Sequence, residues 1–211
     1  MSTPYERIIE FLDDDVKRQD LKDSGVYDRR IQRALLKWHR KFMWSRDTLE
    51  EPVPFTNQNL NIQEIDLRNF TRFRFLRYVR DYDPNAINQT TEPPTQGVAG
   101  KFYAETAPET MLDYFATDKD YVMYRAGEIL RLRSRFVIKN VIVGYFIDPL
   151  LNPVINISSW IAELYPDLIA AEVKVKIFGD LGKDSELKTA QMELAECADT
   201  LYSHNVRIAL Q

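Results

Sequence analysis

The chain has 211 residues, an apolar share of 45%, a charged share of 28% and a formal net charge of −4. This length is sufficient for a well-buried core, and the negative net charge argues against a general nucleic-acid binder. The single cysteine, Cys197, excludes an internal disulfide and a cysteine-cluster metal site. One cysteine fits synthesis in a reducing cytoplasm. No run of about 18 apolar residues occurs, so we expect no membrane partner.

The first 48 residues predict two helices. Thr3-Pro4 followed by Glu6 is typical of a helix start, and an apolar stripe follows and ends before Lys22. A second helix is expected from about Tyr27 to Trp44, since its apolar residues share one face and its basic residues another. Four of these basic residues are separated by four, four and three residues and so lie along one edge of the helix: Arg29, Arg33, Lys37 and Arg40.

From residue 49 to residue 153 the pattern changes to that of strands. Pro52 and Pro54 end the helical region, because two prolines this close cannot lie inside a helix. Residues 73–80 alternate in a period of two, and three more segments are rich in β-branched and aromatic residues, namely 121–124, 128–133 and 140–147. We expect an antiparallel sheet or small sandwich, with one short helical turn within residues 108–115.

Residues 83–100 are polar, contain prolines and show no period. A segment of this length and composition predicts a flexible loop. It could order against a neighbouring subunit, or it could have no role.

The last quarter, from Ser158 to Asn205, predicts two helices separated by the glycine turn 179–182. In the second helix the apolar residues step by three and four and form one stripe: Leu187, Ala190, Leu194, Cys197 and Leu201. We therefore predict one α+β domain over residues 1–211. It combines a helical bundle, formed by the N-terminal helices (1–48) and a C-terminal helical hairpin (154–211), with a β-rich antiparallel insertion (49–153).

No pattern in the sequence predicts catalysis, a cofactor or a metal site. His39 and His204 are far apart and lack an HExxH pattern, and no Walker loop or nucleophile elbow occurs. Asp13, Asp14 and Asp15 are consecutive, so on a helix they point in directions about 100° apart and cannot easily close on one ion. Cys197 lies on an apolar stripe, which favours a buried inert thiol.

The charge distribution favours contact between copies of the chain. Acidic residues gather in 13–15, 50–51 and the last helix, whereas basic residues gather in 29–41 and 68–80. Separate acidic and basic zones suit head-to-tail contact between identical subunits. The stripe of Arg29, Arg33, Lys37 and Arg40 could instead follow the phosphates of DNA, or it could be solvated surface.

The layout resembles the head-to-tail adaptor proteins of tailed bacteriophages, also called head-completion or connector proteins. The resemblance lies in the segments 34–44, 121–132 and 141–149, in Trp160 followed by residues 165–169, and in the glycine break 179–182 before a final helix. The loop 83–100 has no counterpart in that family pattern.

The resemblance implies a structural, non-enzymatic protein of the virion neck, at the head-tail junction. Such adaptors form a ring, commonly of twelve copies. The ring binds below the portal protein, extends the channel for genomic DNA and offers a docking surface to tail or nozzle proteins. The helices would carry the ring contacts, and the β insertion would meet the tail.

Three other functions remain open at this stage. The chain could be a tail-completion or terminator ring protein, which lies lower in the virion. It could be a non-specific DNA-binding module that uses the basic helix. A hydrolase is the weakest alternative, because the sequence nominates no pair of nucleophile and base.

Overall fold

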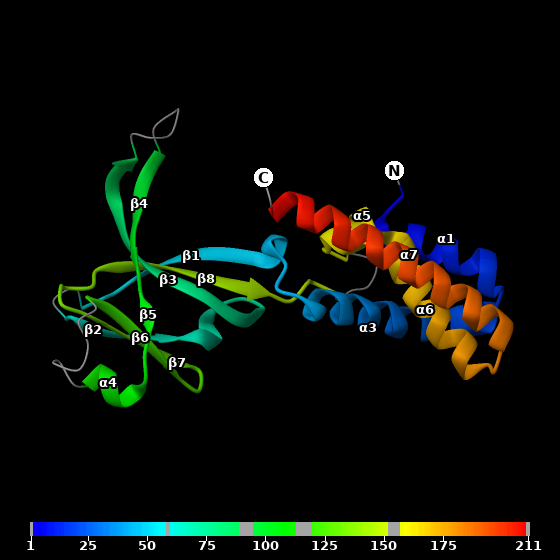
Figure 1. The fold of residues 1–211 in the computed structure, drawn as a ribbon, viewed down its shortest axis with the longest axis horizontal. Coiled ribbons are helices and arrows are strands. Elements are labelled where there is room, and N and C mark those ends of the chain that lie inside the picture. The colour runs from blue at the N-terminus through cyan, green and yellow to red at the C-terminus, as the bar shows by residue number, and fades with distance from the viewer. Residues whose placement is uncertain (1, 58–59, 89–94, 113–119, 152–156, 210–211) are drawn as a thin grey trace. The chain divides into compact units, whose positions relative to one another are not determined.

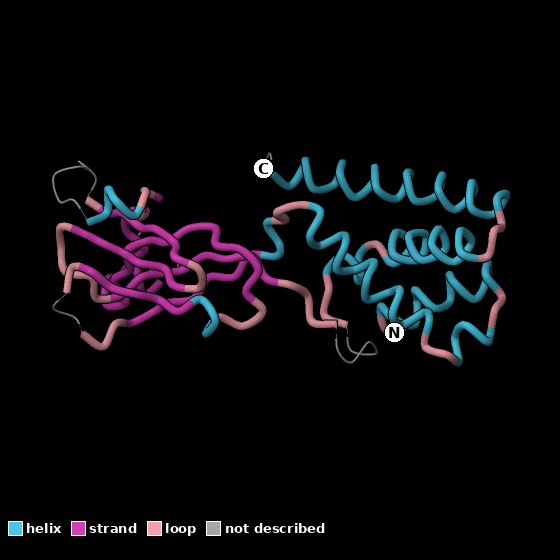
Figure 2. Tube along the Cα trace, turned by 90° about the horizontal axis from the view of Figure 1, so that it is seen from below, coloured by secondary structure: helices cyan, strands magenta, loops and turns pink. Residues whose placement is uncertain are grey.

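The computed structural model describes residues 2–57, 60–88, 95–112, 120–151 and 157–209. The chain divides into two compact units. The helical unit comprises Met1–Arg46 and Asp148–Gln211, and the β unit comprises Asp47–Ile147. Helices, cyan in Figure 2, make up the first unit, and strands, magenta, dominate the second.

The helical unit takes three helices from each end of the chain (Figure 1). Their bounds are α1 Pro4–Val16, α2 Gln19–Asp23, α3 Val26–Lys41, α5 Trp160–Leu164, α6 Pro166–Asp180 and α7 Asp184–Ala209. The predicted start of α1 is confirmed, because Thr3 accepts a hydrogen bond from the Glu6 N–H and the Glu6 side chain reaches back to Thr3. Helix α3 ends at Lys41, three residues before the predicted end.

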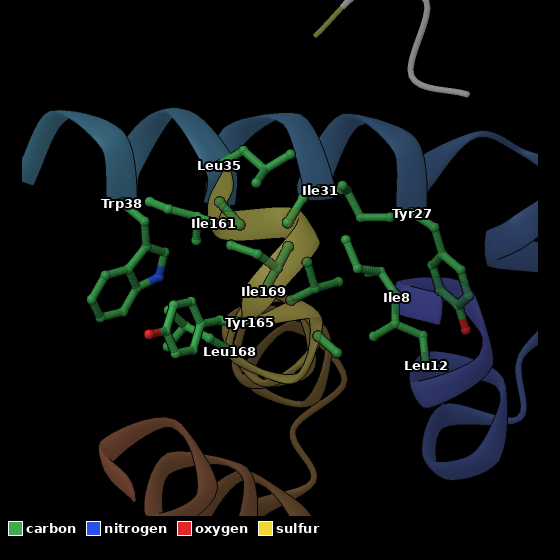
Figure 3. Close-up of a cluster of buried hydrophobic side chains, with 14 of the residues drawn as sticks. Ile8, Leu12, Tyr27, Ile31, Leu35, Trp38, Ile161, Tyr165, Leu168 and Ile169 are labelled. Carbon is green, nitrogen blue, oxygen red and sulfur yellow. The ribbon is translucent and has the colours of Figure 1, made fainter. Parts of the chain in front are cut away.

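Helix α6 lies at the centre of this unit and packs against α1, α3, α5 and α7. It is buried on nearly every side, which is the pattern of a central helix rather than of an amphipathic surface helix. Figure 3 shows side chains of α1, α3, α5 and α6 pointing toward one another, among them Ile8, Leu35 and Ile169. Ala190 and Leu201 of α7 are buried in the same cluster, which confirms the predicted stripe of that helix.

The predicted arrangement of the helices is wrong. They do not form an N-terminal bundle joined to a C-terminal hairpin, because helices from both ends of the chain surround α6. The C-terminal segment also contains one helix more than a hairpin, since α5 ends at Leu164 and α6 begins at Pro166. Proline is favoured in the first turn of a helix, so Tyr165-Pro166 marks a new start within an apolar run.

The β unit contains two four-stranded sheets and the short helix α4, Pro108–Leu112. The first sheet has the order β1-β8-β3-β4, with β1 Thr48–Pro54, β8 Asn140–Ile147, β3 Phe73–Asn88 and β4 Thr95–Phe102. The second has the order β2-β7-β6-β5, with β2 Ile62–Asp66, β7 Ile129–Ser134, β6 Tyr121–Ala126 and β5 Ala104–Glu105. A wholly antiparallel insertion is a wrong prediction, because β5 pairs with β6 in parallel.

The four predicted strands are confirmed as β3, β6, β7 and β8. Their inward residues, among them Val79, Leu130, Val143 and Tyr145, form a second buried cluster that is separate from the helical core. A tight turn joins β6 to β7, and its Gly127 has a φ of 62°. The predicted helical turn is present as α4, and its extension beyond Leu112 falls outside the described residues.

Pro52 and Pro54 lie outside the helices, as predicted, and belong to β1, an edge strand, where a missing N–H can face away from the partner strand. The prediction for residues 83–100 is wrong. The flexible loop predicted for residues 83–100 is largely strand, because 83–88 continue β3 and 95–100 belong to β4. Residues 83–88 and 95–100 pair with each other, although neither segment shows the alternation of apolar and polar residues that predicts a strand. The remainder of that loop, residues 89–94, is not among the described residues.

Candidate functional site

Three of the four predicted basic residues line one groove between α3 and α6. Arg29, Arg33 and Lys37 lie on the α3 side of a groove of about 440 Å³. We call it the basic groove, because its lining includes five cationic and two anionic side chains, namely Arg29, Arg30, Arg33, Lys37, Lys176, Glu172 and Asp180. The periodicity of α3 dictates this placement, since the apolar face of the helix with Tyr27, Ile31 and Leu35 is buried.

Arg40, the fourth predicted residue, has a different role. Its guanidinium binds the carboxylate of Asp148 through two nitrogens and does not line the groove. This hydrogen-bonded pairing raises the pKa of Arg40 above its usual range. Arg40 therefore ties the end of α3 to the segment that leads back from the β unit.

The basic groove has a buried carboxylate in its wall. Glu172 of α6 is nearly inaccessible, and the half-exposed ammonium of Lys37 lies 2.6 Å from its Oε2. Arg30 forms a second ion pair across the groove with Asp180. Among the described residues, no ion pair involves Arg29, Arg33 or Lys176, all of which are exposed. These three cations are therefore free to meet an anionic partner.

The other side of α6 has the opposite character. Phe11 of α1, Asp167 of α6, and Glu193 and Glu196 of α7 line a second groove of about 250 Å³, which we call the acidic groove. Lys174 lies at its base, buried, and binds Asp15 and, at 3.1 Å, Glu193. Burial lowers the pKa of Lys174, but the hydrogen bonds and charges of these carboxylates outweigh burial and leave the pKa raised.

The two grooves use nearly opposite sides of one helix. Glu172, Lys176 and Asp180 face the basic groove, whereas Asp167, Ala171 and Lys174 face the acidic groove. At 3.6 residues per turn these two sets point about 170° apart. Cationic side chains surround the buried carboxylate of Glu172, and carboxylates surround the buried ammonium of Lys174. The helical unit therefore has a basic surface on one side of α6 and an acidic surface on the other.

The other residues considered from the sequence have structural roles in the described part of the chain. His39 is buried, and its Nε2 lies 2.8 Å from Oγ of Ser159, the N-cap residue of α5. His204 contacts the hydroxyl of Tyr165. Asp13 binds Lys22, whereas Asp15 binds Lys174, so neighbouring carboxylates serve different lysines as their angular spacing predicts.

Cys197 packs in part against the helical core and also lines the acidic groove. Its thiol donates a hydrogen bond to Asp167 Oδ2 at 3.4 Å. Burial and the adjacent carboxylates raise the pKa of the thiol to about 12. The nucleophilic thiolate is therefore scarce at neutral pH.

Neither protein-family models nor curated proteins gave a match to this chain. No helix in the described residues combines the length and the apolarity that crossing a membrane requires. The sequence identified the basic residues of α3 but did not place Arg30 in the candidate stripe, and it gave no indication of Lys176 and Glu172. The last two lie on α6, more than a hundred residues away along the chain, and no periodic signal pairs the two helices.

Proposed function

We propose that this chain is a structural, non-enzymatic protein whose copies join side by side into a ring, as head-to-tail adaptor proteins of tailed bacteriophages do. The observation that carries the proposal is the pair of unlike grooves on opposite sides of α6. A contact between two different faces of identical subunits is heterologous, and such contacts close into rings when the rotation permits.

The chemistry of the two grooves is complementary. Arg29, Arg33 and Lys176 supply positive charge without an ion-pair partner in the described residues, and Asp167 and Glu196 supply negative charge on the other side. Phe11, which is 42% exposed, adds an apolar contact beside the acidic residues. Contact between the grooves of neighbouring copies would cover all of these groups.

By resemblance, the ring would hold about twelve copies in the virion neck, below the portal protein and above tail proteins, with DNA in its lumen. A tail-completion ring would use the same contacts between subunits. The grooves therefore support the assembly of a ring, and the place of the ring in the virion rests on the resemblance alone. Mixing the purified protein with a portal or with a tail tube, and imaging which of them it caps, separates these two positions.

The experiment that tests assembly is sedimentation velocity of the purified protein at increasing salt. We expect a large oligomer at low salt that dissociates as salt screens the charges. Arg33→Glu should weaken assembly, whereas Lys188→Glu, the same charge reversal on an exposed residue of α7 outside both grooves, should not. Equal behaviour of the two variants would contradict the proposal.

Non-specific DNA binding is a second candidate, favoured by the three cations of the basic groove that have no ion-pair partner among the described residues. Three phosphate contacts would give a slope of about −3 in a plot of log affinity against log salt. DNA binding by the monomer needs only the basic groove, whereas the ring needs both grooves. Asp167→Lys therefore separates the two functions: it should weaken a ring and leave DNA affinity unchanged or higher.

A further inference from the structure

The β unit contains a groove bordered by two sheet edges. β1 and β2 are terminal strands of different sheets, and residues of both line a groove of about 540 Å³. We call it the edge groove. Its apolar lining includes the buried Phe55, Ile65 and Phe70, so the groove opens onto the core between the sheets.

The β1 side of this groove offers few hydrogen-bond donors. The Phe55 N–H donates to the Lys139 carbonyl at 3.0 Å, so residues 55, 53, 51 and 49 direct their backbone groups toward β8. The alternate residues therefore face the groove, and two of them, Pro52 and Pro54, have no N–H. Proline in this position protects an edge strand against pairing.

The β2 side lacks this protection. The Leu67 N–H donates to Glu128, and the Ser134 N–H donates to Asn61, so the odd-numbered residues of β2 face β7. Ile62, Glu64 and Asp66 therefore direct their N–H and C=O groups away from the sheet. None of these three N–H groups has a hydrogen-bond acceptor among the residues that the structure describes. An open edge of this kind can pair with another strand.

The side chains around the edge groove are apolar or acidic. Among the described residues that line it, Glu51, Glu64 and Asp66 are charged and none is basic. Glu64 and Asp66 already bind Arg131 and Arg68. Glu51 is exposed, and among the described residues it accepts a hydrogen bond only from the hydroxyl of Tyr145, at 3.1 Å. Its charge is therefore available to a cation.

We propose that the edge of β2 binds an extended segment of a partner protein as an added strand, with lysine or arginine alternating with apolar residues. Backbone hydrogen bonds to Ile62, Glu64 and Asp66 supply affinity. The apolar side chains of the segment cover Val53, Ile65 and Phe70, and one basic side chain reaches Glu51. This site is independent of the two grooves of the helical unit.

The probe is a fluorescein-labelled peptide of alternating lysine and valine with blocked ends, about seven residues long like an ordinary strand. Fluorescence anisotropy measures its binding to the full chain. We expect saturable binding, together with slower amide hydrogen exchange at Ile62, Glu64 and Asp66. A peptide that is N-methylated on the face toward β2 should not bind, because it cannot complete the ladder.

Substitutions at Glu64 isolate the backbone contribution. Glu64→Pro removes one outward N–H and should weaken peptide binding about tenfold or more, whereas Glu64→Ala keeps the N–H and should bind nearly as wild type. Ile62→Pro is the second variant, should the first not fold. Glu51→Gln should weaken binding less than the proline variants do.

Three results would overturn the proposal. The first is no binding of the lysine–valine peptide. The second is equal binding by folded proline variants. The third is protection of the β2 amides that increases with protein concentration when no peptide is present, because a second copy of the chain would then occupy the edge.

Discussion

The two units of the molecule differ in which groups they leave available to a partner: charged side chains in the helical unit and backbone groups in the β unit. In the described part of the helical unit, Glu172 and Lys174 are buried charged side chains, each paired across helices, and the grooves beside them contain charges without an ion-pair partner among the described residues. In the β unit, the outward N–H groups of β2 have no acceptor among the described residues at a sheet edge. Side-chain charge suits contact with a surface of opposite charge, whereas an open backbone edge suits an extended segment. The comparison indicates two kinds of interaction in one chain.

The largest effect should come from the core of the helical unit. Leu168 of α6 is fully buried, and Leu168→Ala should cost about 2 to 5 kcal/mol of unfolding free energy. The two hydrophobic clusters have no member in common, so hydrogen exchange should increase in α1, α3 and α6 and remain slow in β3 and β8. Equal loss of protection in both units would show that they unfold together.

Removal of Lys37 should have the next largest effect. Lys37→Ala leaves the carboxylate of Glu172 buried without its partner, which should cost about 2 kcal/mol, because Lys37 is half-exposed and water can replace it in part. Chemical denaturation measures this cost. Arg33→Ala, on the same helix face, should have little effect. Adding Glu172→Met should recover most of the loss, and no recovery would mean that Lys37 stabilises α3 in another way.

A smaller effect should follow from Gly144→Ala in β8. A Cβ atom at Gly144 would lie 2.6 Å from Cζ of Tyr78, whose ring crosses the sheet at this point. The ring also meets Phe102 at a centroid distance of 5.5 Å, so its displacement should cost about 1 kcal/mol. The denaturation midpoint measures it. In a Tyr78→Ala background the cost should disappear, and a persistent cost would place the strain in the backbone.

The smallest effect on the fold concerns the thiol in the acidic groove. With a pKa of about 12, Cys197 should be alkylated slowly by iodoacetamide at pH 8, and the rate should rise with pH. The pKa of the Cys197 thiol is raised from 9.0 in the folded chain, so the folded state favours the protonated thiol. The free energy of unfolding should therefore be highest below pH 9 and should fall as the pH rises toward 12. Asp167→Asn should speed alkylation, and rapid alkylation of the wild type at pH 8 would contradict this electrostatic environment.

Local sequence patterns predicted most helices and the strands with a clear period. Thr3 and Glu6 mark the start of α1, and the apolar face of α3 follows the helical repeat. The same reasoning failed where the structure of a segment depends on the strand or helix that it pairs with or packs against. Pro52 and Pro54 exclude a helix, as the structure confirms, but only the register shows that they lie in β1 and face away from β8. The run through Tyr165 has no boundary signal apart from Pro166.

The candidate site was predictable only in part, for the same physical reason. The spacing of Arg29, Arg33 and Lys37 follows from one helix, so the sequence reveals it. Arg40 fits that spacing equally well, but Asp148 binds it outside the groove. The acidic groove combines α1, α6 and α7, and the open edge of β2 depends on which strand pairs with it. Contacts of long sequence separation leave no local period.

The central claim is that copies join through the basic groove of one and the acidic groove of the next. Its most direct test mixes two variants, Arg29→Glu/Arg33→Glu and Asp167→Lys/Glu196→Lys, and measures their masses by native mass spectrometry. Each variant alone carries grooves of like charge and should remain monomeric. Their equimolar mixture should form an oligomer in which the two alternate. Assembly of either variant alone, or a mixture that stays monomeric where the wild type assembles, would contradict the claim.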